Sequence, residues 1–165
     1  MSSSMARRLS HLTETGDVRM VDVSHKAVTT RTAMARGRVF MHRDTLALVR
    51  EERARKGNVL ATAHLAGVMA AKRTGSLIPL AHNLPLDSVE IAFALDPETS
   101  SIGIESRVKS RGRTGVEMEA LTAVVAAALT LYDMLKAADR GMVMGEFALW
   151  EKRGGRSGVY RRPRA

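Results

Sequence analysis

Residues 116–140 form the longest segment of the chain that favours a helix, and we expect Gly141 to end it. Apolar side chains recur there at three- and four-residue spacing: Leu121, Val124, Val125, Ala128, Tyr132 and Leu135. Such a stripe is stable when it packs against a second layer, so we predict a layered domain with this helix in its core. The apolar stretch 121–135 is interrupted by two threonines and by Asp133, so we expect no membrane-spanning segment.

The other elements are predicted from short apolar patterns and turn residues. We expect strands at about 36–42, 89–95, 101–109 and 143–150, and two further helices at about 44–52 and 58–74. The resulting order is strand, two helices, hairpin, long helix and strand. We therefore predict the α+β class, with a ferredoxin-like antiparallel sheet, helices on one face and one additional helix.

Several helix boundaries are predicted from single residues. Asp44 and Asn58 are the expected N-caps of the two shorter helices. Leu46, Val49 and Arg50 are the side chains expected on the inner face of the first of them, and Gly75 is expected to end the second. Thr114 and Glu117 have the spacing of a capping box that opens the long helix.

The chain of 165 residues is long enough for one domain with its own core. We expect a disordered lead-in over residues 1–19, a single α+β domain over 20–158 and a basic tail over 159–165. The N-terminus lacks the continuous apolar run of a secretory signal, and we expect a cytoplasmic location.

The charge balance favours anionic partners. The formal net charge is +9 and the pI is about 10.8, which suits a phosphate-bearing substrate or a nucleic acid. Only three Phe, two Tyr and one Trp are present, which is few for a surface on which bases stack. The absence of cysteine excludes disulfides, thiolate nucleophiles and cysteine-ligated metals. A basic RNA-binding or ribosome-associated domain remains the alternative from another class.

Acidic and basic residues at the two ends of the long helix are candidate site residues. Asp133 and Lys136 are neighbours on the helix surface, either as an ordinary ion pair or as an acid–base pair. Glu117 and Glu119 either complement the helix dipole or belong to a site. Glu119 and Asp133 are fourteen residues apart, hence about 21 Å at 1.5 Å per residue. If both act in one site, that site is built between two chains.

Four cations alternate along one extended segment, at Arg107, Lys109, Arg111 and Arg113. They either protect an edge strand from aggregation or surround a phosphate near a helix N-terminus. His82 lies in a loop that follows Pro79, a favourable position for a functional residue. Lys56, before Gly57, reads as a solvated turn lysine by itself. We find no ligand spacing typical of a metal site and predict no metal.

Seven segments, in order from about residue 20 to 158, resemble one known family, the cyclic pyranopterin monophosphate synthases of molybdenum-cofactor biosynthesis. They are MVDVS at 20–24, KGNV at 56–59, AAKRT at 70–74, LIPL at 77–80, TGVEMEALT at 114–122, LYDMLKA at 131–137 and GGRSG at 154–158. The runs at 114–122 and 131–137 are the specific ones. The family usually has Cys and Pro where Ala81 and Asn83 stand, and lysine is common where Arg113 and Arg156 stand.

The resemblance implies a lyase that converts a cyclised dihydroguanosine triphosphate into cyclic pyranopterin monophosphate and releases pyrophosphate. It implies that Lys56, Asp133 and Lys136 are the acid–base groups. It implies that the substrate is bound by Arg31, Leu80, Ala81, His82, Glu117, Met118, Glu119 and Lys152. It also implies a ferredoxin-like subunit in a homohexamer, a trimer of dimers, with sites at subunit interfaces and without a membrane or nucleic-acid partner.

Proton transfer near neutral pH needs a lysine with a lowered pKa. We expect Lys56 and Lys136 to face each other across a subunit interface, with Asp133 orienting one of them. No cofactor is expected, and whether magnesium accompanies the triphosphate stays open. A homologue retained only as an assembly subunit is a third interpretation.

Overall fold

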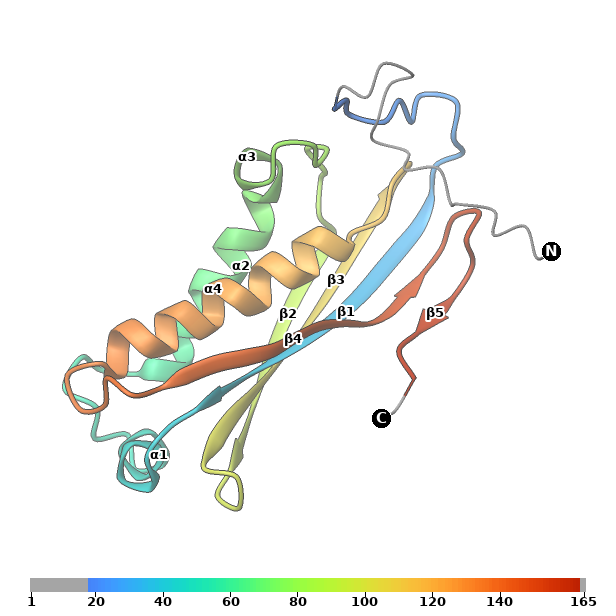
Figure 1. Cartoon of the computed structure of the whole chain (residues 1–165). Helices are drawn as coiled ribbons and strands as arrows, with labels where there is room; N and C mark the ends of the chain where they lie inside the picture. The colour runs from blue at the N-terminus through green and yellow to red at the C-terminus, as the bar shows by residue number, and fades with distance from the viewer. Residues whose placement is uncertain (1–17, 164–165) are drawn as a thin grey trace.

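The computed structural model describes residues 18–163, so the predicted lead-in lies almost wholly outside the described residues. The elements are β1 (Thr29–Phe40), α1 (Arg43–Arg50), α2 (Val59–Lys72), α3 (Thr74–Leu77), β2 (Ser88–Asp96), β3 (Ser101–Gly112), α4 (Glu117–Leu135), β4 (Val143–Arg153) and β5 (Tyr160–Arg161). All pairings in the sheet are antiparallel, in the order β2-β3-β1-β4-β5. Helices α2 and α4 cover one face of the sheet (Figure 1). The α+β, ferredoxin-like prediction is confirmed.

The central strands alternate between the two faces of the sheet, as a pleated strand must. In β1, Ala33, Ala35 and Val39 point toward the helices and are buried, whereas the intervening residues are partly exposed. In β3, the even-numbered residues from 102 to 110 are buried, and Arg107 and Lys109 are exposed on the open face. The core is therefore a single layer between the sheet and the helices.

Helix α4 supplies much of this core. Val124, Ala128 and Leu135 are buried as predicted, and Leu131 is buried as well, whereas Val125 is 37% exposed, contrary to its predicted place in the stripe. The stripe bends around the helix because both the sheet and α2 pack against α4. By length and composition alone α4 is also apolar enough to cross a membrane, but in the fold it packs between these two neighbours.

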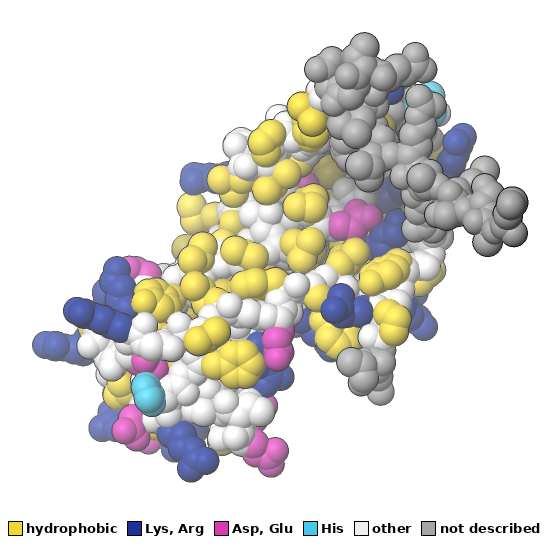
Figure 2. All heavy atoms as spheres, viewed as in Figure 1, with side chains coloured by type: hydrophobic (Ala, Val, Ile, Leu, Met, Phe, Trp, Pro, Cys, Tyr) yellow, Lys and Arg dark blue, Asp and Glu magenta, His cyan; other side chains and the backbone are white. Residues whose placement is uncertain are grey.

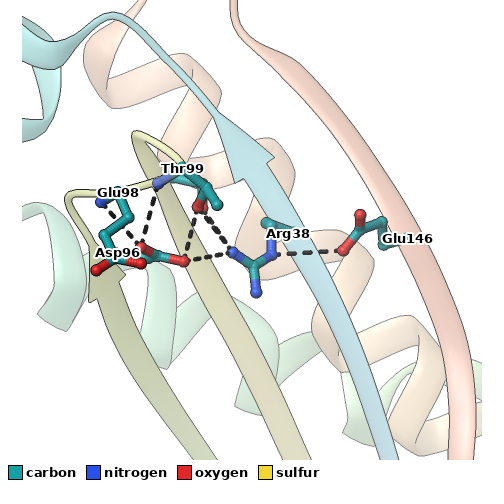
Figure 3. Close-up of polar contacts among 6 residues, drawn as sticks. Arg38, Asp96, Glu98, Thr99 and Glu146 are labelled. Atoms are coloured by element: carbon teal, nitrogen blue, oxygen red, sulfur yellow. Dashed lines mark hydrogen bonds and ion pairs between the residues drawn. The ribbon is translucent and has the colours of Figure 1, made fainter. Parts of the chain in front are cut away.

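A polar network on the open face ties the β2–β3 hairpin to the neighbouring strands (Figure 3). Arg38 donates to the Asp96 carboxylate at 2.9 Å and to the Thr99 hydroxyl at 3.0 Å, and it approaches Glu146 at 3.4 Å. The carboxylate of Asp96 also accepts the backbone N–H groups of Glu98 and Thr99. Asp96 thus organises the turn between the two strands of the predicted hairpin.

Several predicted boundaries are wrong. Strand β1 begins at Thr29, seven residues before the predicted start, because pairing with β3 from Thr29 and with β4 from Thr32 stabilises a segment without a strong local strand pattern. Asn58 caps α2 as predicted, since its side chain accepts the Ala61 N–H at 2.9 Å. His42, and not Asp44, is the N-cap of α1, and Arg50 is exposed.

The limits of α4 also differ from the prediction. Its N-cap is Val116, so Thr114 and Glu117 do not form a capping box. The helix ends at Leu135, well before Gly141, and Gly75 lies inside α3. Strand β3 lies between β2 and β1, so its cations do not protect a sheet edge. Part of the predicted basic tail forms β5, which pairs with β4.

Candidate functional site

The C-terminal turn of α4 brings three charged side chains together. Asp133 and Lys136 lie three residues apart on the helix, and the Lys136 ammonium is 2.7 Å from the Asp133 carboxylate. Lys56, in the turn before α2, reaches the other carboxylate oxygen at 2.9 Å. Lys56 also donates to the Asp133 backbone carbonyl at 2.8 Å. The three residues that the resemblance identifies as acid–base groups therefore form one cluster.

This cluster lies within a single chain, so the expectation that Lys56 and Lys136 face each other from different subunits is wrong. Hydrogen bonds from Lys136 and Lys56 lower the pKa of Asp133 to about 2. The hydrogen bond to Asp133 in turn raises the pKa of Lys136, opposite to the lowered lysine pKa that was expected. The reason is that all three side chains are about half exposed, so burial does not counteract the ion pairs.

A second group of charged residues surrounds a cleft at the N-terminal end of α4. The cleft has a volume of about 700 Å³. Its cationic lining consists of Lys26, Arg31, Arg113, Lys152, Arg153 and Arg156. The acidic residue among them is Glu117, at the first position of α4 and 3.6 Å from the Lys152 ammonium. An excess of cations at a helix N-terminus suits an anion such as a phosphate.

Arg31 is held firmly beneath this cleft. It is only 8% exposed, and its guanidinium donates to the backbone carbonyls of Gly112 at 3.3 Å and Arg113 at 3.2 Å. Gly155, which has a φ of +73°, lies directly over the guanidinium, where a Cβ atom would overlap it. The glycines at 154 and 155 therefore let the loop after β4 close over Arg31.

A smaller and less charged cleft adjoins the cationic one. It has a volume of about 370 Å³ and shares Lys26, Thr114, Gly115 and Glu117 with its neighbour. Its remaining lining is Val21, Val23, Leu80, Ala81, His82, Leu84, Met118 and Glu119. The two clefts thus form one elongated site with a cationic end and a more apolar end.

Two ionisable residues in the smaller cleft, His82 and Glu119, have distinctive surroundings. The Nε2 atom of His82 hydrogen-bonds with the Val21 carbonyl at 2.9 Å, which ties the segment before β1 to the loop after α3. Glu119 is only 4% exposed. Burial raises the pKa of its carboxyl group, and the nearby Glu117 adds to this rise.

The predicted site residues therefore lie in two places. Arg31, Leu80, Ala81, His82, Glu117, Met118, Glu119 and Lys152 line the joined clefts. Lys56, Asp133 and Lys136 lie at the opposite end of α4, about 21 Å away by helix rise. One chain does not bring the two groups together.

The four cations that alternate along residues 107–113 do not all lie at the cationic cleft. Of the four alternating cations, Arg113 lines the cleft, whereas Arg107 and Lys109 line a groove on the open sheet face. Lys26 was missed by the sequence reasoning, and a lysine just before the first strand carries no distinctive local signal. Within residues 18–163, no three His, Asp or Glu side chains gather into a possible metal site.

The departure at Asn83 has a simple structural account. The Asn83 side chain lies against the backbone of α3 at Gly75, where a Cβ atom would overlap the amide oxygen. Within the loop over residues 78–83, the backbone N–H of Ala81 donates to the carbonyl of Ile78 at 3.0 Å. The loop that carries His82 is thus supported by contacts to α3.

Known proteins resemble this chain over most of its length. Residues 20–155 match the model of the MoaC family. A cyclic pyranopterin monophosphate synthase of Heliobacterium modesticaldum is 60% identical over 152 residues, which cover 92% of this chain and 96% of that protein. The synthase of Thermomicrobium roseum is 59% identical over 154 residues, which cover 93% of each chain. The synthase of Parvibaculum lavamentivorans is 54% identical over 156 residues, which cover 94% of this chain and 98% of that protein. The chain belongs to the MoaC family.

Proposed function

We propose that the chain is a cyclic pyranopterin monophosphate synthase, a lyase of molybdenum-cofactor biosynthesis. Its substrate is a cyclised dihydroguanosine triphosphate, and pyrophosphate is the second product. The observation that carries the proposal is the identity of 54–60% to synthases over more than nine-tenths of the chain. The same comparisons give no support to an RNA-binding domain. We place the enzyme in the cytoplasm, where guanosine triphosphate is available.

The joined clefts suit the two halves of such a substrate. The cationic cleft around Arg31 and Lys152 takes the triphosphate and stabilises the charge that develops as pyrophosphate leaves. The smaller cleft takes the ring system, whose polar edge meets the buried Glu119 carboxyl group. Lys26 lines both clefts and lies at the junction between phosphates and ring.

Proton transfer requires the Lys56–Asp133–Lys136 cluster to approach the ring. Because one chain holds this cluster about 21 Å from Glu119, a second copy has to supply it. The Asp133 carboxylate then holds both ammonium groups in position, and burial under the partner counteracts the rise in the pKa of Lys136.

An exposed apolar surface supports association between copies. Figure 2 shows apolar side chains gathered over the face where α4 and β4 lie side by side. Large exposed side chains there and on α2 are Leu65, Met69, Val125, Leu129, Val143 and Phe147. A patch of this kind marks a protein–protein interface. We propose that copies pair through it and that pairs assemble into a homohexamer, a trimer of dimers.

The direct test is incubation with the cyclised guanosine triphosphate, with and without magnesium, followed by measurement of pyrophosphate and the pterin product. We expect turnover by the wild-type protein. Asp133→Asn should abolish it while the oligomer persists, because Asn cannot hold two ammonium groups by charge. The matched control is Asp87→Asn, in an exposed loop. A wild-type oligomer without turnover would instead favour an assembly subunit, and full activity of Asp133→Asn would remove Asp133 from the mechanism.

A further inference from the structure

Asp139, four residues beyond the end of α4, has a buried carboxylate that none of the roles above uses. It is only 4% exposed. One oxygen accepts the His42 N–H at 2.9 Å and the Thr45 hydroxyl at 3.4 Å. The other accepts the Gly141 N–H at 2.8 Å. A single side chain thus joins the turn after α4 to the start of α1.

These contacts take the place of a local helix cap. His42 is the N-cap of α1, but its own side chain makes no capping hydrogen bond. The Asp139 carboxylate binds the first turn of α1 instead, and its negative charge lies at the positive end of that short helix. The position of α1 therefore depends on a residue 97 positions away along the chain.

Both segments that Asp139 joins lead directly to the acid–base cluster. Asp139 follows Lys136 by three residues, and the backbone N–H of Asp139 bonds to the Leu135 carbonyl at 3.1 Å. Helix α1 continues into the turn that carries Lys56, and that turn is fixed to α1 by the Arg53 N–H bond to Leu48 at 2.9 Å. A shift of α1 relative to α4 would thus move Lys56 relative to Asp133.

We propose that Asp139 is a positioning residue, which sets the distance between Lys56 and the Asp133–Lys136 pair by holding α1 against the turn after α4. The hydroxyl of Tyr132 supports the same turn through the Arg140 carbonyl, at 3.3 Å. Asp139 touches no substrate in this scheme and acts through the three cluster residues. The proposal rests on the proposed function, because its main measurement is turnover.

The test compares two pairs of variants by kcat and KM for the cyclised guanosine triphosphate. Asp139→Asn removes the charge that holds α1, and Asp96→Asn removes a similarly hydrogen-bonded carboxylate at the β2–β3 hairpin, away from the cluster. We expect Asp139→Asn to lower kcat by about 10- to 100-fold with KM within about 2-fold, since a displacement of about 1 Å costs about 100-fold in rate. Asp96→Asn should keep both constants within about 2-fold.

The second pair leaves Asp139 in place. His42 has a φ of −65°, which proline also adopts, so His42→Pro removes the N–H donor with little change of backbone. His42→Ala removes the side chain and keeps the donor. We expect His42→Pro to lower kcat in the same direction as Asp139→Asn, and His42→Ala to leave it unchanged.

Each outcome has one reading. A folded Asp139→Asn with unchanged kcat, or equal losses in His42→Pro and His42→Ala, would overturn the positioning role. Asp139→Asn that does not fold would leave the decision to the His42 pair. Absence of turnover in the wild-type protein would contradict the proposed function instead. In that case, protection of the Lys56 amine from acylation, compared between His42→Pro and His42→Ala, tests the geometry without turnover.

Discussion

At the scale of single residues, Glu119 is an acid with 4% of its surface exposed, beside a second acid, Glu117. Burial removes water from the carboxylate, and this favours the protonated form. Its neighbours Ala120 and Ala123 on α4 are apolar and fully buried. The protein therefore keeps an ionisable group at a place where a neutral side chain would cost less. Such a cost is common at binding sites.

This cost predicts a pH-dependent difference between the wild-type protein and Glu119→Gln. The folded-state pKa of Glu119 is raised above 4.5, so the folded state holds the proton longer than the unfolded state. Wild-type stability should therefore fall as the pH rises from 4.5 through the folded-state pKa. Glu119→Gln lacks this ionisation and should be more stable at pH 7, with each unit of pKa shift worth about 1.4 kcal/mol.

The measurement is urea unfolding from pH 4 to pH 8 at constant protein concentration. Glu98→Gln, an exposed acid in the hairpin turn, is the control for the loss of one charge. The same variant Glu119→Gln should lose most of its turnover if Glu119 contacts the ring. A stability advantage that grows toward pH 4 would contradict the assigned direction of the shift.

At the scale of elements, α2 and α4 pack closely because small residues line their contact. Gly67 on α2 faces Ala123 and Ala127 on α4 and also the side chain of Ile91 on β2, which is nearest to the place of a Cβ atom. A Cβ atom at Gly67 would lie 2.9 Å from the Ala123 carbonyl oxygen, closer than van der Waals contact allows. This close approach packs the middle of α2 against α4, and the N-terminal end of α2 begins just after the turn that carries Lys56.

We therefore expect Gly67→Ala to destabilise the protein, because an overpacked core has a steric cost of about 1–3 kcal/mol. The higher helix propensity of alanine offsets about 1 kcal/mol of the steric cost. Gly145→Ala is the matched control, because a Cβ atom there meets nothing within 4 Å. Thermal unfolding of both variants decides the matter. Equal Tm values for the two would show that the helices separate without cost.

At the scale of the whole molecule, α4 carries the two halves of the proposed site at its opposite ends. The joined clefts surround its first turn, and the Lys56–Asp133–Lys136 cluster surrounds its last turn. Figure 1 shows residues 18–28 and the turn between β4 and β5 at one end of the sheet and α1 at the other. If both halves act in one site, as proposed above, the first turn of α4 in one copy meets the last turn of α4 in another.

This arrangement predicts complementation between two inactive variants. Asp133→Asn and Glu119→Gln are refolded together in equal amounts, and turnover is compared with each variant alone. If each site takes Asp133 from one copy and Glu119 from another, about one quarter of the sites in randomly mixed oligomers are intact. We expect turnover near that fraction of the wild-type value. Turnover no higher than that of the separate variants would show that one chain supplies both residues.

Local patterns in the sequence are sufficient to predict much of the fold. The spacing of Val124, Ala128 and Leu135 predicts the buried face of α4, and Asn58 predicts the start of α2. Helix periodicity and capping depend on residues within a few positions of each other, so they can be read directly. The proposed roles of Asp133, Lys56 and the other candidate site residues rest on the family resemblance, because the spacing of Asp133 and Lys136 equally fits an ordinary ion pair.

The tertiary structure decided what depends on distant residues. It brings Lys56 to Asp133 from 77 positions away, places Arg31 beneath the loop at Gly155, and extends β1 back to Thr29 by pairing with β3. It also raises the pKa of Lys136 where the sequence reasoning expected a lysine with a lowered one. Burial and charge pairing are set by which segments meet when the chain packs, and local propensity contains no information about that.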